Sequence, residues 1–236
     1  MGKTIAIVED EPAIRENYAD ALSKQGYDID QYASREEAMK SFEQRLPDLA
    51  LLDIGLNDEI DGGFELCRAL RAMSDSLPII FLTARDSDLD TISGLRLGAD
   101  DYLTKDISIP NLCARISAFF RRLDSLKEPT AQDELIERGP LTLDMNRFTA
   151  HWKDASGNNQ LVDLTLTEFW IVHTLALRPG HVKNREQLMD DAKIVVDDAT
   201  ITSHIKRIRN KFTKLDKNFD CVDTVYGMGY RWTEKN

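Results

Sequence analysis

The chain has 236 residues, of which 42% are hydrophobic and 30% are charged, and these values are typical of a globular protein with one or two domains. No apolar run approaches the ~20 residues that a bilayer crossing needs, and the acidic Glu9 and Asp10 come too early for a signal peptide. Three widely separated cysteines, Cys67, Cys113 and Cys221, argue against a disulfide framework or a zinc site and indicate a reducing cytoplasm. A membrane protein, a secreted scaffold and a disordered chain are thereby excluded.

The net charge of −11 is unevenly distributed along the chain. Residues 1–125 hold 14 basic and 24 acidic side chains, a net charge of −10, and residues 126–236 hold 16 basic and 17 acidic ones, a net charge of −1. This asymmetry predicts two domains with separate tasks. Any nucleic-acid function must then come from a local cluster of cations.

The first half alternates short apolar runs with amphipathic stretches. The predicted strands are Thr4–Val8, Tyr27–Gln31, Leu49–Asp53, Ile79–Thr83 and Asp101–Thr104. The predicted helices are Pro12–Lys24, Arg35–Arg45, Gly63–Met73, Leu89–Leu97 and Ile109–Leu126. Such alternation predicts an α/β domain with a doubly wound, five-stranded parallel sheet.

Five polar side chains follow or end the predicted strands. Glu9 and Asp10 end the first strand, Asp53 ends the third, Thr83 ends the fourth and Lys105 follows the fifth. Because the carboxyl ends of strands line the ligand crevice of an open α/β sheet, we expect these side chains to meet. Carboxylates suit Mg²⁺, and an aspartate can accept a phosphoryl group. An ammonium and a hydroxyl would neutralise the transferred group's oxygens.

Four motifs of the first half resemble the receiver domain of two-component response regulators, which has a flavodoxin-like fold. They are Ile7-Val8-Glu9-Asp10-Glu11, Leu51-Leu52-Asp53, Leu82-Thr83-Ala84-Arg85 and Gly98-Ala99-Asp100-Asp101-Tyr102-Leu103-Thr104-Lys105. The resemblance implies that a sensor histidine kinase phosphorylates Asp53. It implies Mg²⁺ on Asp10, Asp53 and the backbone of Gly55, assisted by Glu9. It also implies that Lys105 contacts the phosphoryl group and that Thr83 and Tyr102 form a switch pair.

Three departures from the family pattern bear on phosphorylation. Asp106 stands where proline usually follows the lysine, so a cis peptide bond is not expected there. Asn57 replaces the usual proline in the loop after Asp53. That loop is one residue longer and continues as the acidic run 58–61, whose charge should oppose phosphorylation or alter its lifetime.

The second half begins after a polar stretch that we interpret as a linker over residues 126–139, between a domain of residues 1–125 and one of residues 140–236. The predicted strands are Leu141–Asp144, Arg147–Trp152, Leu161–Leu164, Val222–Val225 and Tyr230–Trp232. The predicted helices are Thr165–Leu177, Arg185–Ala192 and Asp198–Leu215. This order predicts an α+β domain.

The last helix is basic along one side. Ile201, Ile205, Ile208 and Phe212 recur at helical spacing and should face the core. Between His204 and Lys214 the other positions include five cations and no acid. A solvated charged face is the ordinary explanation of such a run, but a glycine-rich hairpin follows it, and helix plus hairpin suits a major-groove DNA reader.

These segments resemble the winged-helix effector domain of the OmpR/PhoB family. The motifs are Leu164-Thr165-Leu166-Thr167-Glu168-Phe169, Arg178-Pro179-Gly180, Arg185-Glu186-Gln187-Leu188, His204-Ile205-Lys206-Arg207-Ile208-Arg209-Asn210-Lys211 and Thr224-Val225-Tyr226-Gly227-Met228-Gly229-Tyr230-Arg231. The implied DNA contacts are Thr200, Ser203, His204 and Arg207 at base edges or phosphates, Lys206 and Lys211 on the backbone, and Arg231 on the wing.

The resemblance also implies partners. Dimers bind promoter DNA at direct-repeat half-sites, and the loop of residues 193–198 faces RNA polymerase. A receiver homodimer forms through charged residues, of which Asp100, Asp101, Arg115 and Arg122 match. The sequence thus predicts a cytoplasmic, non-enzymatic, phosphorylation-gated transcription regulator. Two alternatives stay open: a phosphorylation-independent dimeric DNA-binding regulator with an atypical receiver, and an α/β phosphatase that uses Asp53 as nucleophile.

Overall fold

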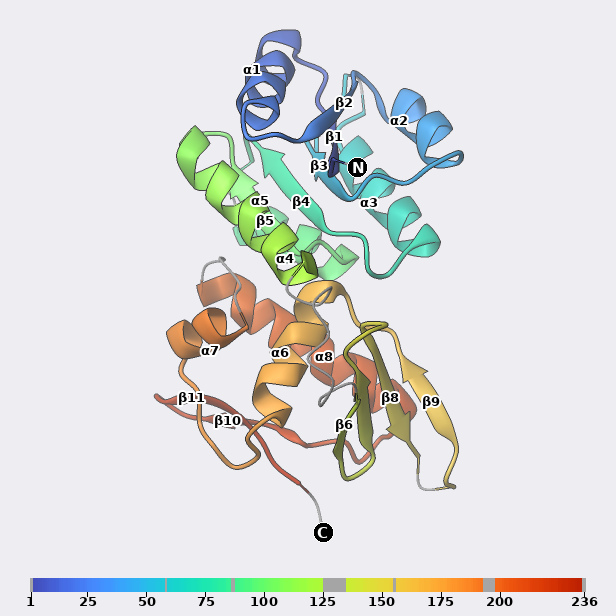
Figure 1. Cartoon of the computed structure of the whole chain (residues 1–236), viewed down its shortest axis with the longest axis vertical. Coiled ribbons are helices and arrows are strands. Elements are labelled where there is room, and N and C mark those ends of the chain that lie inside the picture. The colour runs from blue at the N-terminus through green and yellow to red at the C-terminus, as the bar shows by residue number, and fades with distance from the viewer. Residues whose placement is uncertain are drawn as a thin grey trace. The chain divides into compact units, whose positions relative to one another are not determined.

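The computed structural model describes residues 2–57, 59–85, 88–124, 135–154, 156–192 and 198–234. The chain divides into two compact units, residues 1–116 and 117–236, and each is described by itself. Figure 1 shows the elements of both units. The division falls within helix α5 (Ile109–Asp124), and the domain limits at residues 125 and 140 stay predictions.

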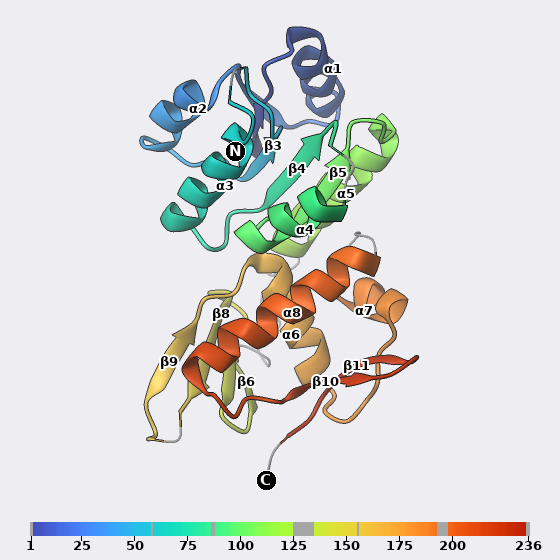
Figure 2. The same cartoon turned by 180° about the vertical axis from the view of Figure 1, so that it is seen from behind.

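The first unit is built on a five-stranded parallel sheet, as predicted. Its strands are β1 (Thr4–Val8), β2 (Asp28–Tyr32), β3 (Leu49–Leu52), β4 (Ile79–Thr83) and β5 (Asp101–Thr104), in the order β2-β1-β3-β4-β5. Its other helices are α1 (Pro12–Ser23), α2 (Arg35–Phe42), α3 (Gly62–Met73) and α4 (Asp88–Leu97). Helices α1 and α5 cover one face of the sheet, and α2, α3 and α4 cover the other (Figures 1 and 2).

The register of the sheet brings the strand ends together. Val8 of β1 pairs with Leu52 of β3, and Thr83 of β4 pairs with Thr104 of β5. Strands β3 and β4 are buried along their whole length, because helices cover both faces. In β3 and β4, polar side chains are therefore found only at or just past the carboxyl ends, at Thr83 and Asp53, where the candidate site lies.

The second unit combines an antiparallel sheet, three helices and a hairpin. The sheet contains β6 (Leu135–Arg138), β7 (Leu141–Asp144), β8 (Thr149–Lys153) and β9 (Asn159–Val162). The helices are α6 (Leu166–Ala176), α7 (Arg185–Asp191) and α8 (Asp198–Leu215), and β10 (Val222–Val225) and β11 (Gly229–Trp232) form the hairpin. This is the expected winged-helix arrangement. Strand β6 lies within residues 126–139, the stretch predicted to be a linker; Ile136 is buried and β6 pairs with β7.

The apolar stripe of α8 packs into the core of the second unit, as predicted. Ile201, Ile205, Ile208 and Phe212 are all buried. The Phe212 ring stacks on Phe219 with 4.5 Å between centroids. This packing fixes the rotation of α8 about its axis and so decides which of its polar side chains reach solvent.

Candidate functional site

Four predicted side chains of the first unit, Glu9, Asp10, Asp53 and Lys105, converge at the carboxyl edge of the sheet. Lys105 places its Nζ atom 2.7 Å from Asp53 Oδ2 and 2.8 Å from Glu9 Oε2. Glu9, Asp10 and Asp53 each present a carboxylate oxygen within 4.8 Å of the others. Asp53 and Glu9 are buried, whereas Asp10 is half-buried. Residues that lie up to 96 positions apart in the chain are therefore in contact at the strand ends, as their positions in the sequence predict.

The backbone around Asp53 is held tightly. The Ile54 N–H donates to Asp53 Oδ1 at 2.7 Å, and the Gly63 N–H donates to the Ile54 carbonyl at 2.8 Å. A Cβ atom on Gly63 would lie 1.9 Å from the Asp53 carbonyl oxygen, so only glycine fits there. Sequence reasoning missed Gly63, since a glycine at the start of a helix gives no signal of such a close approach.

The charges of this cluster favour a cation. Burial raises the pKa of Glu9, and the hydrogen bond from Lys105 only partly offsets this effect. Burial lowers the pKa of Lys105, but hydrogen bonds to Asp53 and Glu9 outweigh it, so the pKa is raised and the ammonium stays charged. One ammonium does not balance three carboxylates, and oxygen donors of this kind fit Mg²⁺. Gly55, two residues after Asp53, stays a predicted backbone ligand.

The predicted switch pair meets at Arg85. Thr83 is buried, and its hydroxyl accepts a hydrogen bond from the Arg85 N–H at 3.4 Å. The Tyr102 hydroxyl donates to the Arg85 carbonyl at 3.0 Å. Thr83 and Tyr102 are thus linked through one residue of the loop after β4. No described peptide bond is cis, as expected from Asp106.

The acidic loop after Asp53 is tied to its surroundings. Asn57 has a positive φ of 52° and donates its N–H to Asp10 Oδ2 at 2.8 Å. Glu59 forms an ion pair of 2.5 Å with Arg35. Asp61 forms one of 3.0 Å with Arg85. Two arginines therefore offset part of the negative charge that the sequence assigns to this loop, whose residue 58 lies outside the described residues.

The DNA contacts predicted on α8 fall into two groups. Thr200, His204 and Arg207 are buried, whereas Lys206 is exposed and Ser203 is half-buried. The predicted contact set is corrected accordingly: the stripe that contains Thr200, His204 and Arg207 faces the protein. The side chains that reach solvent lie on a neighbouring stripe of the same helix.

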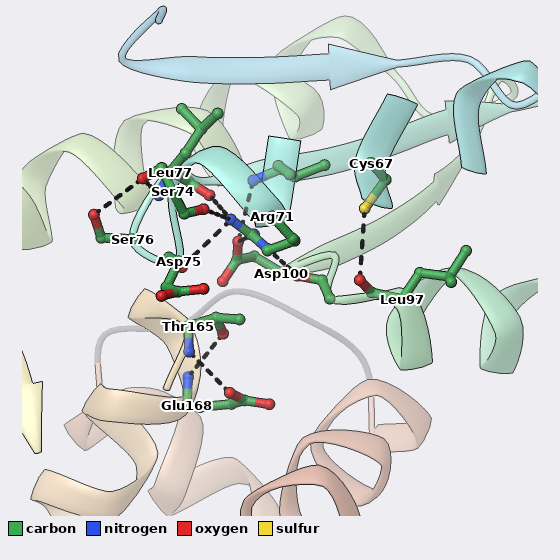
Figure 3. Close-up of polar contacts among 12 residues, drawn as sticks. Cys67, Arg71, Ser74, Asp75, Ser76, Leu77, Leu97, Asp100, Thr165 and Glu168 are labelled. Atoms are coloured by element: carbon green, nitrogen blue, oxygen red, sulfur yellow. Dashed lines mark hydrogen bonds and ion pairs between the residues drawn. The ribbon is translucent and has the colours of Figure 1, made fainter. Parts of the chain in front are cut away.

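Glu168 explains why that stripe is turned inward. Its carboxylate forms ion pairs of 2.6 Å with Arg207 and 2.7 Å with Lys211. It also completes a capping box with Thr165 at the start of α6, drawn in Figure 3. Burial would raise the pKa of Glu168, but Arg207, Lys211 and His204 lower it to about 2. Arg207 and Lys211, predicted to contact DNA, are therefore engaged with a buried carboxylate.

A groove of about 580 Å³ lies between α8, the start of α7 and the hairpin. Arg185, Thr202, Lys206 and Arg209 line it. The Arg209 guanidinium donates to the Val222 carbonyl at 2.9 Å and to Thr224 Oγ1 at 2.7 Å, which ties α8 to the hairpin. Sequence reasoning did not single out Arg185 or Thr202.

The predicted dimer residues make contacts within one chain. Asp100 pairs with Arg71 at 2.7 Å, and the Arg71 guanidinium also donates to the Leu77 carbonyl (Figure 3). It donates to the Gly98 carbonyl as well, at 2.8 Å. Asp101 pairs with Arg115 at 2.8 Å. Both aspartates are buried. The Arg122 side chain and residues 193–197 of the predicted polymerase-facing loop lie outside the described part of the chain.

Comparison with known proteins agrees with both halves. Residues 5–117 match the response regulator receiver domain, and residues 158–232 match the domain family described as transcriptional regulatory protein, C terminal. The chain is 38% identical over 232 residues to the transcriptional regulatory protein BaeR of Escherichia coli O6:H1, covering 97% of this chain and 92% of BaeR. It is 36% identical to the phosphate regulon transcriptional regulatory protein PhoB of Rhizobium meliloti, covering 96% of each.

The chain belongs to the OmpR/PhoB family of response regulators. The crystal structure of DrrB, an OmpR/PhoB homologue from Thermotoga maritima, matches with 27% identity and a TM-score of 0.52, covering 99% of this chain and 100% of DrrB. This OmpR/PhoB regulator therefore joins a receiver domain to a DNA-binding domain and acts in transcription regulation. None of its described helices is long and apolar enough to span a membrane.

Proposed function

We propose that this protein is a cytoplasmic transcription regulator whose promoter binding is gated by phosphoryl transfer from a sensor histidine kinase to Asp53. The observation that carries the proposal is the pairing of Asp53 with Lys105, 2.7 Å apart, beside Glu9 and Asp10. A solvent-exposed aspartate at an ordinary loop start would not have an ammonium and two further carboxylates around it. Here the acceptor is surrounded by the groups that phosphoryl transfer needs.

In the transfer step, an Asp53 carboxylate oxygen attacks the phosphorus of a phosphohistidine. A P–O bond forms, the P–N bond breaks, and the imidazole leaves with a proton from solvent. The Lys105 ammonium balances charge on the phosphoryl oxygens, and the Thr83 hydroxyl donates a hydrogen bond to one of them. Mg²⁺, held by Glu9, Asp10, Asp53 and the Gly55 carbonyl, would supply further charge neutralisation.

The response passes through Arg85. If the Thr83 hydroxyl turns to the phosphoryl group, its hydrogen bond with the Arg85 N–H is lost. The Arg85 carbonyl accepts the hydrogen bond of the Tyr102 hydroxyl, so a movement of Arg85 also changes the contact of Tyr102. We propose that this rearrangement favours a receiver homodimer. Two linked DNA-binding domains then occupy direct-repeat half-sites together, which raises affinity without any new contact to DNA, and RNA polymerase is engaged at the promoter.

The phosphorylation step is tested by intact mass after incubation with acetyl phosphate and Mg²⁺. We expect wild type to gain one phosphate and Asp53→Asn to gain none. Glu59→Gln, which removes a nearby carboxylate outside the cluster, serves as the matched control and should be phosphorylated. A phosphate retained by Asp53→Asn would show that the acceptor is another residue.

For DNA binding we propose contacts through Lys206 and Ser203 on the outward side of α8, with Arg185 at the edge of the groove. Thr200, His204, Arg207 and Lys211 orient the helix instead. Lys206→Ala should weaken binding and lower the slope of log affinity against log salt concentration by about 1, since one phosphate contact is lost. Lys153→Ala, an exposed charge on β8 away from the groove, should leave the slope unchanged.

A second candidate keeps the DNA-binding half but dispenses with phosphorylation. Asp106 and Asn57 favour it, because both replace residues that are common around the site. Promoter output in cells distinguishes the two functions. Lost output from Asp53→Ala supports gating by phosphorylation, whereas output equal to wild type supports a receiver that acts as a constitutive dimer module.

A further inference from the structure

Asn57 lies in a tight turn of the loop after Asp53. Leu56 and Glu59 exchange backbone hydrogen bonds of 3.1 and 2.9 Å, which close this turn. Asn57, the second residue of the turn, has a φ of 52°. Asparagine tolerates this left-handed backbone conformation better than most residues do, whereas the ring of proline fixes φ at about −65°. The proline that is usual at this position therefore cannot form the turn that the structure shows.

The turn directs the backbone of Asn57 toward the acidic cluster. Its N–H donates to Asp10 Oδ2 at 2.8 Å. Its side chain donates from Nδ2 to the Ala33 carbonyl at 3.1 Å, which ties the turn to the loop between β2 and α2. A proline has no N–H to donate. The contact with Asp10 therefore depends on the replacement of proline by another residue.

Asp10 is held differently from the other two carboxylates of the cluster. Glu9 and Asp53 are both paired with Lys105. Within the described part of the chain, Asp10 forms no ion pair, and the Asn57 N–H is the one donor to its carboxylate. A carboxylate has about four acceptor positions, so this bond leaves positions for a cation. The N–H thus fixes the direction of the Asp10 carboxylate beside its two neighbours without neutralising its charge.

We propose that Asn57 is a positioning residue of the magnesium site, whose backbone N–H holds the Asp10 carboxylate in place for the cation. The inference rests on the proposed function, which assigns Mg²⁺ to Glu9, Asp10 and Asp53. Carboxylates that bind metals are themselves oriented by hydrogen bonds, and loss of such a partner typically weakens metal binding by about 10- to 100-fold. The replacement of proline in this loop therefore supplies the site with a donor that the usual residue lacks.

The test measures the Mg²⁺ affinity of the full chain from amide chemical shifts in an NMR titration with magnesium chloride. Asn57→Pro, which removes the N–H, should bind Mg²⁺ about tenfold more weakly than wild type. Asn57→Gly keeps the N–H and allows the positive φ, so it should rescue the affinity. Phosphorylation by acetyl phosphate gives a second readout. The Mg²⁺ concentration at half-maximal rate should rise about tenfold in Asn57→Pro, whereas a general disturbance of the fold would lower the rate at saturating Mg²⁺.

Wild-type Mg²⁺ affinity in Asn57→Pro would overturn the inference. An equal loss in Asn57→Gly would also overturn it, because the effect would then belong to the side-chain bond with Ala33. If Asn57→Pro does not fold, hydrogen exchange of wild type decides. The Asn57 amide should exchange more slowly than in the unfolded chain, both without and with Mg²⁺, and free exchange in the Mg²⁺-bound protein would contradict the proposal.

Failure of the proposed function gives a different result. If wild type binds no Mg²⁺, the metal site assigned in the proposed function fails, and the role of Asn57 fails with it. If wild type binds Mg²⁺ and Asn57→Pro binds it equally well, the inference alone fails. The two failures are therefore distinguishable in one titration series.

Discussion

The carboxyl edge of the receiver sheet and the polar surface of α8 were both predicted as binding sites from their residue types. The predicted side chains meet at the sheet edge, whereas several of those on α8 are buried in the protein. At the sheet edge, Glu9, Asp53 and Lys105 are in direct contact. On α8, three of the six side chains predicted to contact DNA are buried. The two regions differ in what fixes the direction of a side chain.

In a parallel sheet, topology decides which residues meet. Every strand ends at the same edge, so the residue after a strand has one place to go. A helix has an apolar stripe flanked by two polar stripes. On α8, His204, Arg207 and Lys211 lie toward Glu168, and Thr202, Lys206 and Arg209 lie toward the groove. Helical spacing alone does not say which polar stripe another element will cover.

The strongest test of the sheet-edge geometry is Gly63→Ala. The new Cβ atom would lie 1.9 Å from the Asp53 carbonyl oxygen, which is backbone that cannot move without displacing the acceptor. We expect the receiver to lose more than about 3 kcal/mol of stability, at or beyond the upper range for overpacking, together with phosphorylation by acetyl phosphate. Calorimetry and intact mass measure the two effects.

Gly55→Ala is the matched control for that variant. Gly55 lies in the loop between Asp53 and α3, its Cβ atom would meet nothing within 4 Å, and its carbonyl is retained. It should unfold and be phosphorylated like wild type. Equal behaviour of the two alanine variants would mean that the close approach at Gly63 does not determine the position of Asp53.

On the α8 side, the corresponding test is Glu168→Gln. The variant leaves the buried Arg207 without its counter-charge, and loss of one partner of a buried pair is strongly destabilising. The pKa of Glu168, lowered from 4.5 to about 2, corresponds to about 3 kcal/mol. The free energy of unfolding of the DNA-binding domain should be lower by about 3 kcal/mol at neutral pH. Glu137→Gln, on exposed β6, should have no effect.

The same carboxylate gives a pH dependence. Because its pKa is lower in the folded protein, its contribution is complete above pH 4.5 and is lost as the pH falls from 4.5 toward 2. Wild type should therefore lose stability in this window more steeply than Glu168→Gln. Parallel curves for the two proteins would mean that another group causes the acid sensitivity of this domain.

The sequence predicted the architecture and the acceptor cluster because both depend on local patterns and on topology. It could not predict the roles of Gly63 and Glu168. Gly63 matters through the approach of a distant backbone segment, and Glu168 matters through the packing of α6 against α8. Strand β6 was missed for a related reason: only Ile136 of its four residues is buried, so the strand has no apolar pattern.

The smallest effect is expected from the exposed pairs of the loop after Asp53. Arg35→Ala leaves the charge of Glu59 unbalanced, and repulsion through solvent should slow phosphorylation by acetyl phosphate about twofold at low salt. Arg68→Ala, which breaks a similar exposed pair with Glu65 on α3, is the control. The difference between the two rates should shrink as salt is raised. A difference that persists at high salt would mean that Arg35 holds the loop in place through its contact with Glu59. The loop after Asp53 would then depend on contacts with a neighbouring element, as the side chains of α8 do.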